Sequence, residues 1–180
     1  MTACTDPGVR AVKMGKDEPR HTVLFVCTGN TCRSPMAAAL LNHLCAPREI
    51  CSACPDNGAS GAYTATSAGL CATEGDPITP AAAKALREAG VVSTSANRYE
   101  AHRAHRVNEA DVATADIIVA ITAAHAMELM LRFPDAASKI RTLPMDIADP
   151  FGGSDELYRT CLSQLRYCLQ IAFFMGEQTP

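Results

Sequence analysis

A thiol and an arginine separated by five residues, Cys27 and Arg33, are the side chains in this sequence best suited to chemistry. Their segment, 27–35, follows an apolar run typical of a buried strand, 22–26, and precedes a run typical of a helix start, 36–41. Loop N–H groups and the positive end of a helix dipole attract an anion, and an arginine fork can bind two phosphate oxygens. The same field favours a thiolate, so the segment predicts a phosphate-binding loop with Cys27 as a nucleophile toward phosphorus.

The residues after Arg33 indicate where the helix begins. Serine is a favoured N-cap and proline suits the first helical position, so we expect Ser34 to cap the helix and Pro35 to open it. Taken singly, two cysteines near a strand end are most often buried thiols, and a Gly-Asn pair is most often a turn. The agreement of strand, loop, arginine spacing and helix favours the phosphate loop.

Beyond these features, the chain resembles the low-molecular-weight protein-tyrosine phosphatase family over roughly residues 21–176. The Cys-x5-Arg-Ser-Pro motif carries the resemblance, and three later segments match in the family's order. These segments are Ser67-Ala68-Gly69, Ala101-His102-Arg103-Ala104 continuing to Ala113-Thr114-Ala115-Asp116, and Asp149-Pro150-Phe151.

The resemblance implies a role for each matched residue. Cys27 would form a phosphocysteine intermediate, Arg33 would clamp the equatorial phosphate oxygens, and Asp149 would act as acid for the leaving group and then as base for water. The expected phosphate- and substrate-binding residues are Thr28, Gly29, Asn30, Thr31, Cys32, Ser34 and Phe151.

The resemblance also implies supports for the loop. Asn30 would be held in a left-handed conformation by a network that includes Ser67 and His102, although His102 alone would read as a solvated helix histidine. The Ser34 hydroxyl would bond the thiolate. In the family, the second loop cysteine, here Cys32, can form a reversible disulfide with the nucleophile that protects it from over-oxidation.

Two positions depart from the tyrosine-specific members and resemble the bacterial protein-arginine phosphatases of the same family. Thr31 replaces a bulky aliphatic residue, and Phe151 is followed by Gly152-Gly153 instead of a second aromatic residue. A phosphotyrosine ring favours two aromatic walls, whereas phosphoarginine is a slender chain ending in a polar guanidine. We therefore expect phosphoarginine as the substrate, with a protein-tyrosine phosphatase as the alternative; Thr31 could also simply fill space.

Two other classes of protein use a similar loop. A thiol-dependent arsenate reductase of this fold needs two further cysteines near the third helix, and residues 91–115 contain none. Cys161 and Cys168 lie in an apolar helical pattern that favours buried thiols. A non-catalytic phosphate-binding module would be free to lose the nucleophile, the arginine or the acid, and this chain has all three.

Composition favours one cytoplasmic domain, and the resemblance implies phosphorylated proteins as partners and no cofactor. The chain has 180 residues and a net charge of −3, which does not favour a nucleic-acid surface, and we expect no membrane partner either. It has neither an apolar signal segment nor a run of the ~18 apolar residues that span a membrane.

The nine cysteines of the chain are expected to be reduced thiols, because a cytoplasmic protein rarely forms disulfides. Cys51-x2-Cys54, with Cys45 and Cys71 nearby, resembles half a zinc knuckle, but the other half is missing and we expect no metal.

The chain divides into a mobile extension, 1–20, and a phosphatase-like domain, 21–180, with an insertion at 47–61. We expect strands at 22–26, 63–68, 116–122 and 140–145, and later helices at 79–89, 108–115, 125–133 and 155–174. This alternation predicts an α/β fold: an open parallel sheet of about four strands with helices on both faces. Ligands bind beyond the carboxyl ends of such strands, where Cys27 and Asp149 fall.

Overall fold

The structure is a computed structural model that describes residues 20–46 and 63–175. The predicted N-terminal extension, the predicted insertion and the pair Cys51 and Cys54 lie outside the described residues, apart from Arg20. Within the described ranges, no helix is long and apolar enough to cross a membrane.

A four-stranded sheet, all of whose neighbouring strands are parallel, forms the centre of the fold and confirms the expected architecture. The strands are β1 (His21–Cys27), β2 (Tyr63–Gly69), β3 (Ile117–Ala120) and β4 (Ile140–Thr142), in the order β2-β1-β3-β4. β1 and β2 pair over their full lengths, and this register sets Cys27 opposite Gly69. β1 also pairs with β3 from Val23 to Val26, so the strand is flanked on both sides almost to its end.

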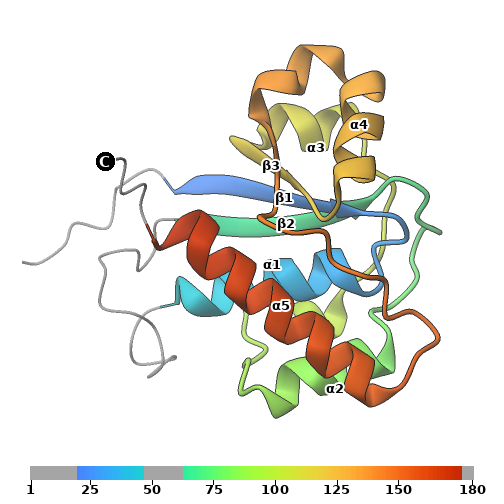
Figure 1. Cartoon of the computed structure of the whole chain (residues 1–180), viewed down its shortest axis with the longest axis vertical. Coiled ribbons are helices and arrows are strands. Elements are labelled where there is room, and N and C mark those ends of the chain that lie inside the picture. Colours follow the sequence, from blue (N-terminus) through green and yellow to red (C-terminus); the bar gives the residue numbers. More distant parts are fainter. Residues whose placement is uncertain (1–19, 47–62, 176–180) are drawn as a thin grey trace, which may run out of the picture.

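Helices cover both faces of the sheet, as predicted. The α-helices are α1 (Arg33–Leu44), α2 (Pro80–Glu88), α3 (Glu109–Thr114), α4 (Ala123–Arg132) and α5 (Asp155–Phe173). Figure 1 shows α1, α2 and α5 on one side of the sheet and α3 and α4 on the other. Two short 3-10 helices that the sequence did not predict, η1 (Tyr99–Ala101) and η2 (Pro134–Lys139), lie in the connections.

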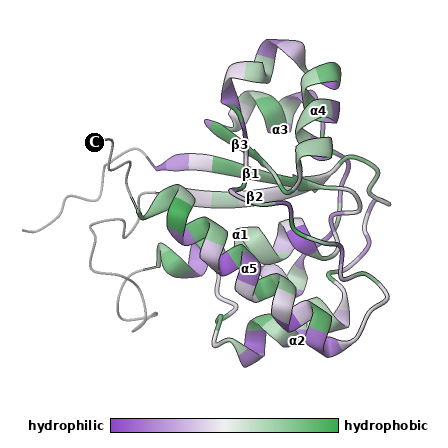
Figure 2. Cartoon of the chain, viewed as in Figure 1, coloured by the Kyte–Doolittle hydropathy of each residue, from purple (hydrophilic) through white to green (hydrophobic). Residues whose placement is uncertain are grey.

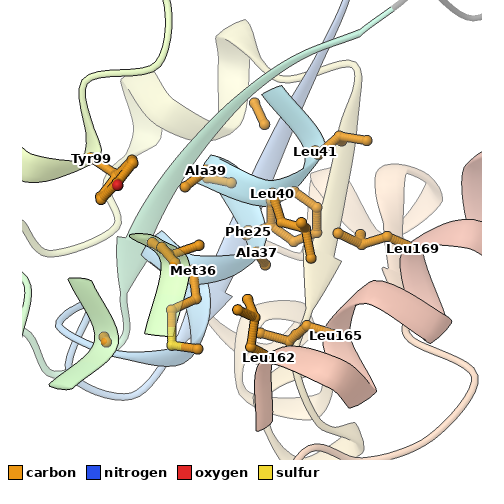
Figure 3. Packing of buried hydrophobic residues seen from close by; sticks show 14 of the residues in the cluster. Phe25, Met36, Ala37, Ala39, Leu40, Leu41, Tyr99, Leu162, Leu165 and Leu169 are labelled. Carbon is orange, nitrogen blue, oxygen red and sulfur yellow. The ribbon is translucent and has the colours of Figure 1, made fainter. Parts of the chain in front are cut away.

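Residues 23–27 of β1 are all apolar because both faces of the strand are buried there. Phe25 packs into the cluster on the side of α1 and α5, whereas Leu24 and Val26 pack into the cluster on the side of α3 and α4. Figure 3 shows side chains of β1, α1 and α5 packed together, among them Leu40 and Leu169. Figure 2 shows that α5 carries both hydrophilic and hydrophobic residues along its length, as expected for a helix with one face in the core.

The start of α1 differs from the prediction. The helix begins at Arg33, its N-cap is Cys32, and no side chain caps it. Ser34 lies within the first turn, fully buried, where its hydroxyl bonds other side chains and so is not used as a cap. The first helical bond runs from the Met36 N–H to the Cys32 carbonyl, so Pro35 occupies a position whose missing N–H would have no helical acceptor.

Other boundaries shift by a few residues. β4 ends at Thr142, three residues before the predicted end, and β3 is shorter than predicted at both ends. α4 begins at Ala123, two residues early, because the Thr122 side chain accepts a bond from the His125 N–H and caps the helix. Thr79, at the predicted start of α2, caps that helix by accepting a bond from the Ala82 N–H, and Gly90 follows the helix with a φ of 76°.

Candidate active site

The predicted loop residues line one cavity of about 430 Å³ at the carboxyl edge of the sheet. Residues 27–33 form its floor, and Asp149 and Phe151 reach it from the segment between β4 and α5. The opposite wall comes from residues 71–80, between β2 and α2. Three predicted residues, Ser34, Ser67 and His102, do not line this cavity; they contact the loop or its nucleophile from elsewhere.

Cys27 is the last residue of β1, and its side chain is almost completely buried. Its Sγ lies 3.0 Å from the Ser34 hydroxyl oxygen. The Asn30 amide donates to that same oxygen over 3.0 Å, so the hydroxyl proton remains available for the sulfur or for the Ala68 carbonyl at 3.2 Å. The arrangement places a hydroxyl donor beside the Cys27 sulfur.

Asn30 shapes the loop from its centre. Its φ is 55°, and it is the only non-glycine residue with positive φ in the described part of the chain. The side-chain amide donates to Ser34 and to the Ser67 hydroxyl (2.9 Å), and its oxygen accepts the His105 backbone N–H (3.1 Å). The Asn30 carbonyl accepts from Nε2 of His102 at 2.7 Å, which requires a proton on that nitrogen. These bonds hold a backbone conformation that would otherwise be unfavourable.

The end of β2 supports the loop from its side. A Cβ atom on Gly69 would lie 2.7 Å from the Thr28 carbonyl oxygen, which is too close for any side chain. The next two backbone N–H groups, of Leu70 and Cys71, donate to the carbonyls of Cys27 and Thr28, each over 2.9 Å. The loop thus packs directly on a strand end that must lack a side chain.

Arg33 lies beneath the cavity with only 7% of its side chain exposed. Its Nη2 donates to Asp149 Oδ2 at 2.5 Å and lies 3.4 Å from the Thr28 hydroxyl, and Nη1 donates to the Ile147 carbonyl at 3.3 Å. The buried Nε–H has no hydrogen-bond partner among the described residues. Because an unpartnered buried donor is costly, this N–H fits an oxygen of a bound phosphate.

Asp149 is half exposed and faces both the arginine and the cavity. Its second oxygen, Oδ1, accepts the backbone N–H of Phe151 at 3.2 Å. The Phe151 ring is 70% exposed at the rim. The acid and the aromatic residue are therefore linked in one turn, where both can meet the group attached to a bound phosphate.

Four residues around the loop were not identified from the sequence. Cys32 Sγ lies 3.3 Å from the Thr79 hydroxyl and 3.4 Å from the Tyr158 hydroxyl, and burial raises the pKa of Tyr158 to about 12. His105 supports Asn30, and His125 contacts Thr28. Thr79 could have been suspected as a helix cap near a predicted loop, whereas no local signal marks the other three.

The remaining cysteines fall outside this constellation or at its edge. Cys161 and Cys168 are buried, as predicted, and burial raises the pKa of Cys161 to about 12. Burial also raises the pKa of Cys45 to about 11. Cys71 is exposed in the cavity wall. Over residues 20–46 and 63–175, no three His, Cys, Asp or Glu side chains are grouped to hold a metal ion.

This chain is similar to known proteins over most of its length. A family model described as low molecular weight phosphotyrosine protein phosphatase matches residues 22–173. A protein-arginine-phosphatase of Geobacillus stearothermophilus is 36% identical over 81% of this chain and 88% of its own length, and one of Bacillus subtilis is 32% identical over 82% and 91%. The structure of a low molecular weight protein tyrosine phosphatase from T. tengcongensis aligns with a TM-score of 0.69 and 32% identity, covering 83% of this chain and 95% of the other. The chain belongs to the low molecular weight phosphotyrosine protein phosphatase family.

Proposed function

We propose that this protein removes phosphate from phosphoarginine side chains of proteins, through a phosphocysteine intermediate on Cys27. The observation that carries the chemistry is one cavity lined by Cys27, Arg33 and Asp149, with the Nε–H of Arg33 left without a hydrogen-bond partner among the described residues. A nucleophile, an anion clamp and a proton donor are the three groups that phosphoryl transfer through a covalent enzyme intermediate needs.

The reaction would proceed in two displacements. The Cys27 thiolate attacks phosphorus, the P–N bond breaks, and Asp149 gives a proton to the departing guanidine nitrogen. Asp149, now a carboxylate, takes a proton from a water that attacks the phosphocysteine. The P–S bond then breaks, and inorganic phosphate leaves while Cys27 returns as a thiolate.

The ion pair between Arg33 and Asp149 fits this cycle. Arg33 Nη2 donates to Asp149 Oδ2 across 2.5 Å, so the acid lies directly beside the anion clamp. A phosphate dianion that engages the guanidinium would compete with the carboxylate for this donor and leave Asp149 free to face the leaving group.

The walls of the cavity support phosphoarginine over phosphotyrosine. Phe151 is the only aromatic residue among the described residues that line it, and the facing wall presents side chains such as Thr73, Ile78 and Thr79. A tyrosine ring would therefore find one aromatic surface where stacking on both faces needs two. Thr31 adds a hydroxyl to the floor, and the two relatives with 36% and 32% identity are named protein-arginine-phosphatases.

Phosphotyrosine is the second candidate substrate, since a relative from Staphylococcus haemolyticus with 29% identity is named a low molecular weight protein-tyrosine-phosphatase. The test compares kcat/KM on two peptides that are identical except at one position, where one carries phosphoarginine and the other phosphotyrosine. We expect the phosphoarginine peptide to be the better substrate, and Cys27→Ser to abolish turnover of both. A wild-type preference for phosphotyrosine would overturn the arginine assignment and leave the covalent mechanism standing.

A further inference from the structure

His125 is a buried histidine that the mechanism above does not use. It lies on α4, on the face of the sheet opposite α1, and its ring reaches the phosphate loop between two hydroxyl groups. Nε2 lies 2.9 Å from the Thr28 hydroxyl oxygen, and Nδ1 lies 2.9 Å from the Thr122 hydroxyl oxygen. Thr28 immediately follows the nucleophile and lines the cavity.

The hydrogen bonds of Thr122 favour one tautomer of this ring, because only that tautomer gives the Thr122 hydroxyl proton a side-chain acceptor among the described residues. The Thr122 oxygen already accepts the His125 backbone N–H, at 3.3 Å. Among the described residues, Nδ1 of His125 is the only side-chain acceptor within hydrogen-bond reach of the Thr122 hydroxyl proton. A neutral imidazole that accepts at Nδ1 carries its proton on Nε2, so Nε2–H donates to Thr28.

A neutral ring is also what its surroundings favour. Burial, followed by the positive charge of Arg33, lowers the pKa of His125, and this outweighs the opposing effect of Glu128, Asp149 and Asp146.

The Thr28 hydroxyl then has its two acceptor positions filled. One receives Nε2–H of His125 and the other lies 3.4 Å from Nη2 of Arg33. A hydroxyl with two accepted bonds has only its proton left to offer. Since Thr28 lines the cavity, that proton is free to point at a bound anion.

We propose that His125 is a positioning residue that turns the Thr28 hydroxyl into a donor to the phosphoryl group. The proposal rests on phosphoryl transfer at Cys27, but not on whether the substrate is phosphoarginine or phosphotyrosine. A donor fixed in place before the reaction stabilises the charge on the transferring phosphoryl oxygens without further reorganisation.

The first test reads the tautomer directly and needs no turnover. Nitrogen-15 NMR of the full chain labelled at histidine should show the His125 ring protonated at Nε2 and accepting at Nδ1 near neutral pH. Thr122→Val removes the donor to Nδ1 and should shift the Nδ1 resonance, whereas His21→Asn, an exposed histidine on β1, should not. A wild-type ring protonated at Nδ1 would overturn the proposal, even if the enzyme proved fully active.

The second test measures kcat on para-nitrophenyl phosphate, a substrate that does not depend on the arginine assignment. Thr28→Val should lower kcat by roughly 10- to 100-fold, the range for one hydrogen bond to a charged group, and Thr28→Ser should restore most of it. His125→Leu should lose a similar factor, and His125→Gln, which keeps an amide donor, should recover part of it.

The double variant Thr28→Val, His125→Leu separates positioning from mere structural support. If His125 acts through Thr28, the double variant should lose no more activity than Thr28→Val alone. Losses that multiply would refute the proposal, as would a Thr28→Val enzyme with wild-type kcat. If His125→Leu fails to fold, the NMR measurement and the His125→Gln variant decide the question.

Discussion

Replacing Asn30 by alanine should destabilise the phosphate loop in two ways, because it removes hydrogen bonds and leaves a residue that disfavours the backbone conformation at this position. Asn30→Ala deletes three side-chain hydrogen bonds, to Ser34, Ser67 and the His105 N–H. At about 1 kcal/mol each, their loss should lower the free energy of unfolding by about 3 kcal/mol. Alanine at a φ of 55° adds about 1 kcal/mol, because it lacks the short polar side chain that lets asparagine tolerate left-handed backbone.

Asn30→Gly is the matched control, since glycine loses the same bonds but tolerates positive φ. In urea unfolding, the free energy of unfolding of the glycine variant should therefore be about 3 kcal/mol below that of wild type, and that of the alanine variant about 1 kcal/mol lower still. Both should lose at least roughly tenfold in kcat/KM, because the loop that holds the phosphate is no longer fixed. If the free energy of unfolding of the alanine variant lay within about 1 kcal/mol of the wild-type value, the claim that these bonds hold the loop would be refuted. If the two variants were equally stable, the claim that alanine is strained at this position would be refuted.

Three further predictions concern the reacting groups. Asp149→Asn should slow the hydrolysis of substrates with poor leaving groups by roughly 10²- to 10⁴-fold, and should slow the hydrolysis of an activated aryl phosphate less. Single-turnover kinetics measures both rates, and equal losses on the two substrates would argue against a role of Asp149 as acid. Thr31→Ile should shift relative kcat/KM by roughly 5- to 150-fold away from phosphoarginine and toward phosphotyrosine peptides, and a parallel loss on both would indicate only a distorted loop. Mild peroxide should inactivate the enzyme reversibly through a Cys27 to Cys32 disulfide, and mass spectrometry that instead finds sulfinic acid on Cys27 with Cys32 free would contradict this protection.

The sequence predicted the parts of the site that are close together along the chain. The loop lies between β1 and α1, and the composition of these three consecutive segments alone indicates a phosphate loop. Asp149 is distant in sequence and was predicted only from the Asp-Pro-Phe motif that resembles the family. The boundary error at Ser34 has a physical cause. Serine is a favoured N-cap in general, but here its hydroxyl is used by Cys27 and Asn30, which local propensity cannot reveal.

The parts that escaped prediction depend on contacts between distant residues. His125 is 97 positions from Thr28, and Tyr158 is 126 positions from Cys32. A lone histidine near a helix start, or a tyrosine on an amphipathic helix, carries no local sign of its partner. Only the arrangement of the sheet and its covering helices brings these side chains to the loop.

The register of β1 and β2 has a consequence for how the protein folds. Cys27 pairs with Gly69, the residue whose missing side chain leaves room for the loop. A slip of β2 by one residue would place Ala68 or Leu70 at that position and push a side chain against the Thr28 carbonyl, while also turning the strand's buried residues to the opposite face. A chain with misaligned strands would then be unable to assemble its phosphate loop. The recovery of catalytic activity during refolding would therefore measure the fraction of chains whose strands are correctly aligned.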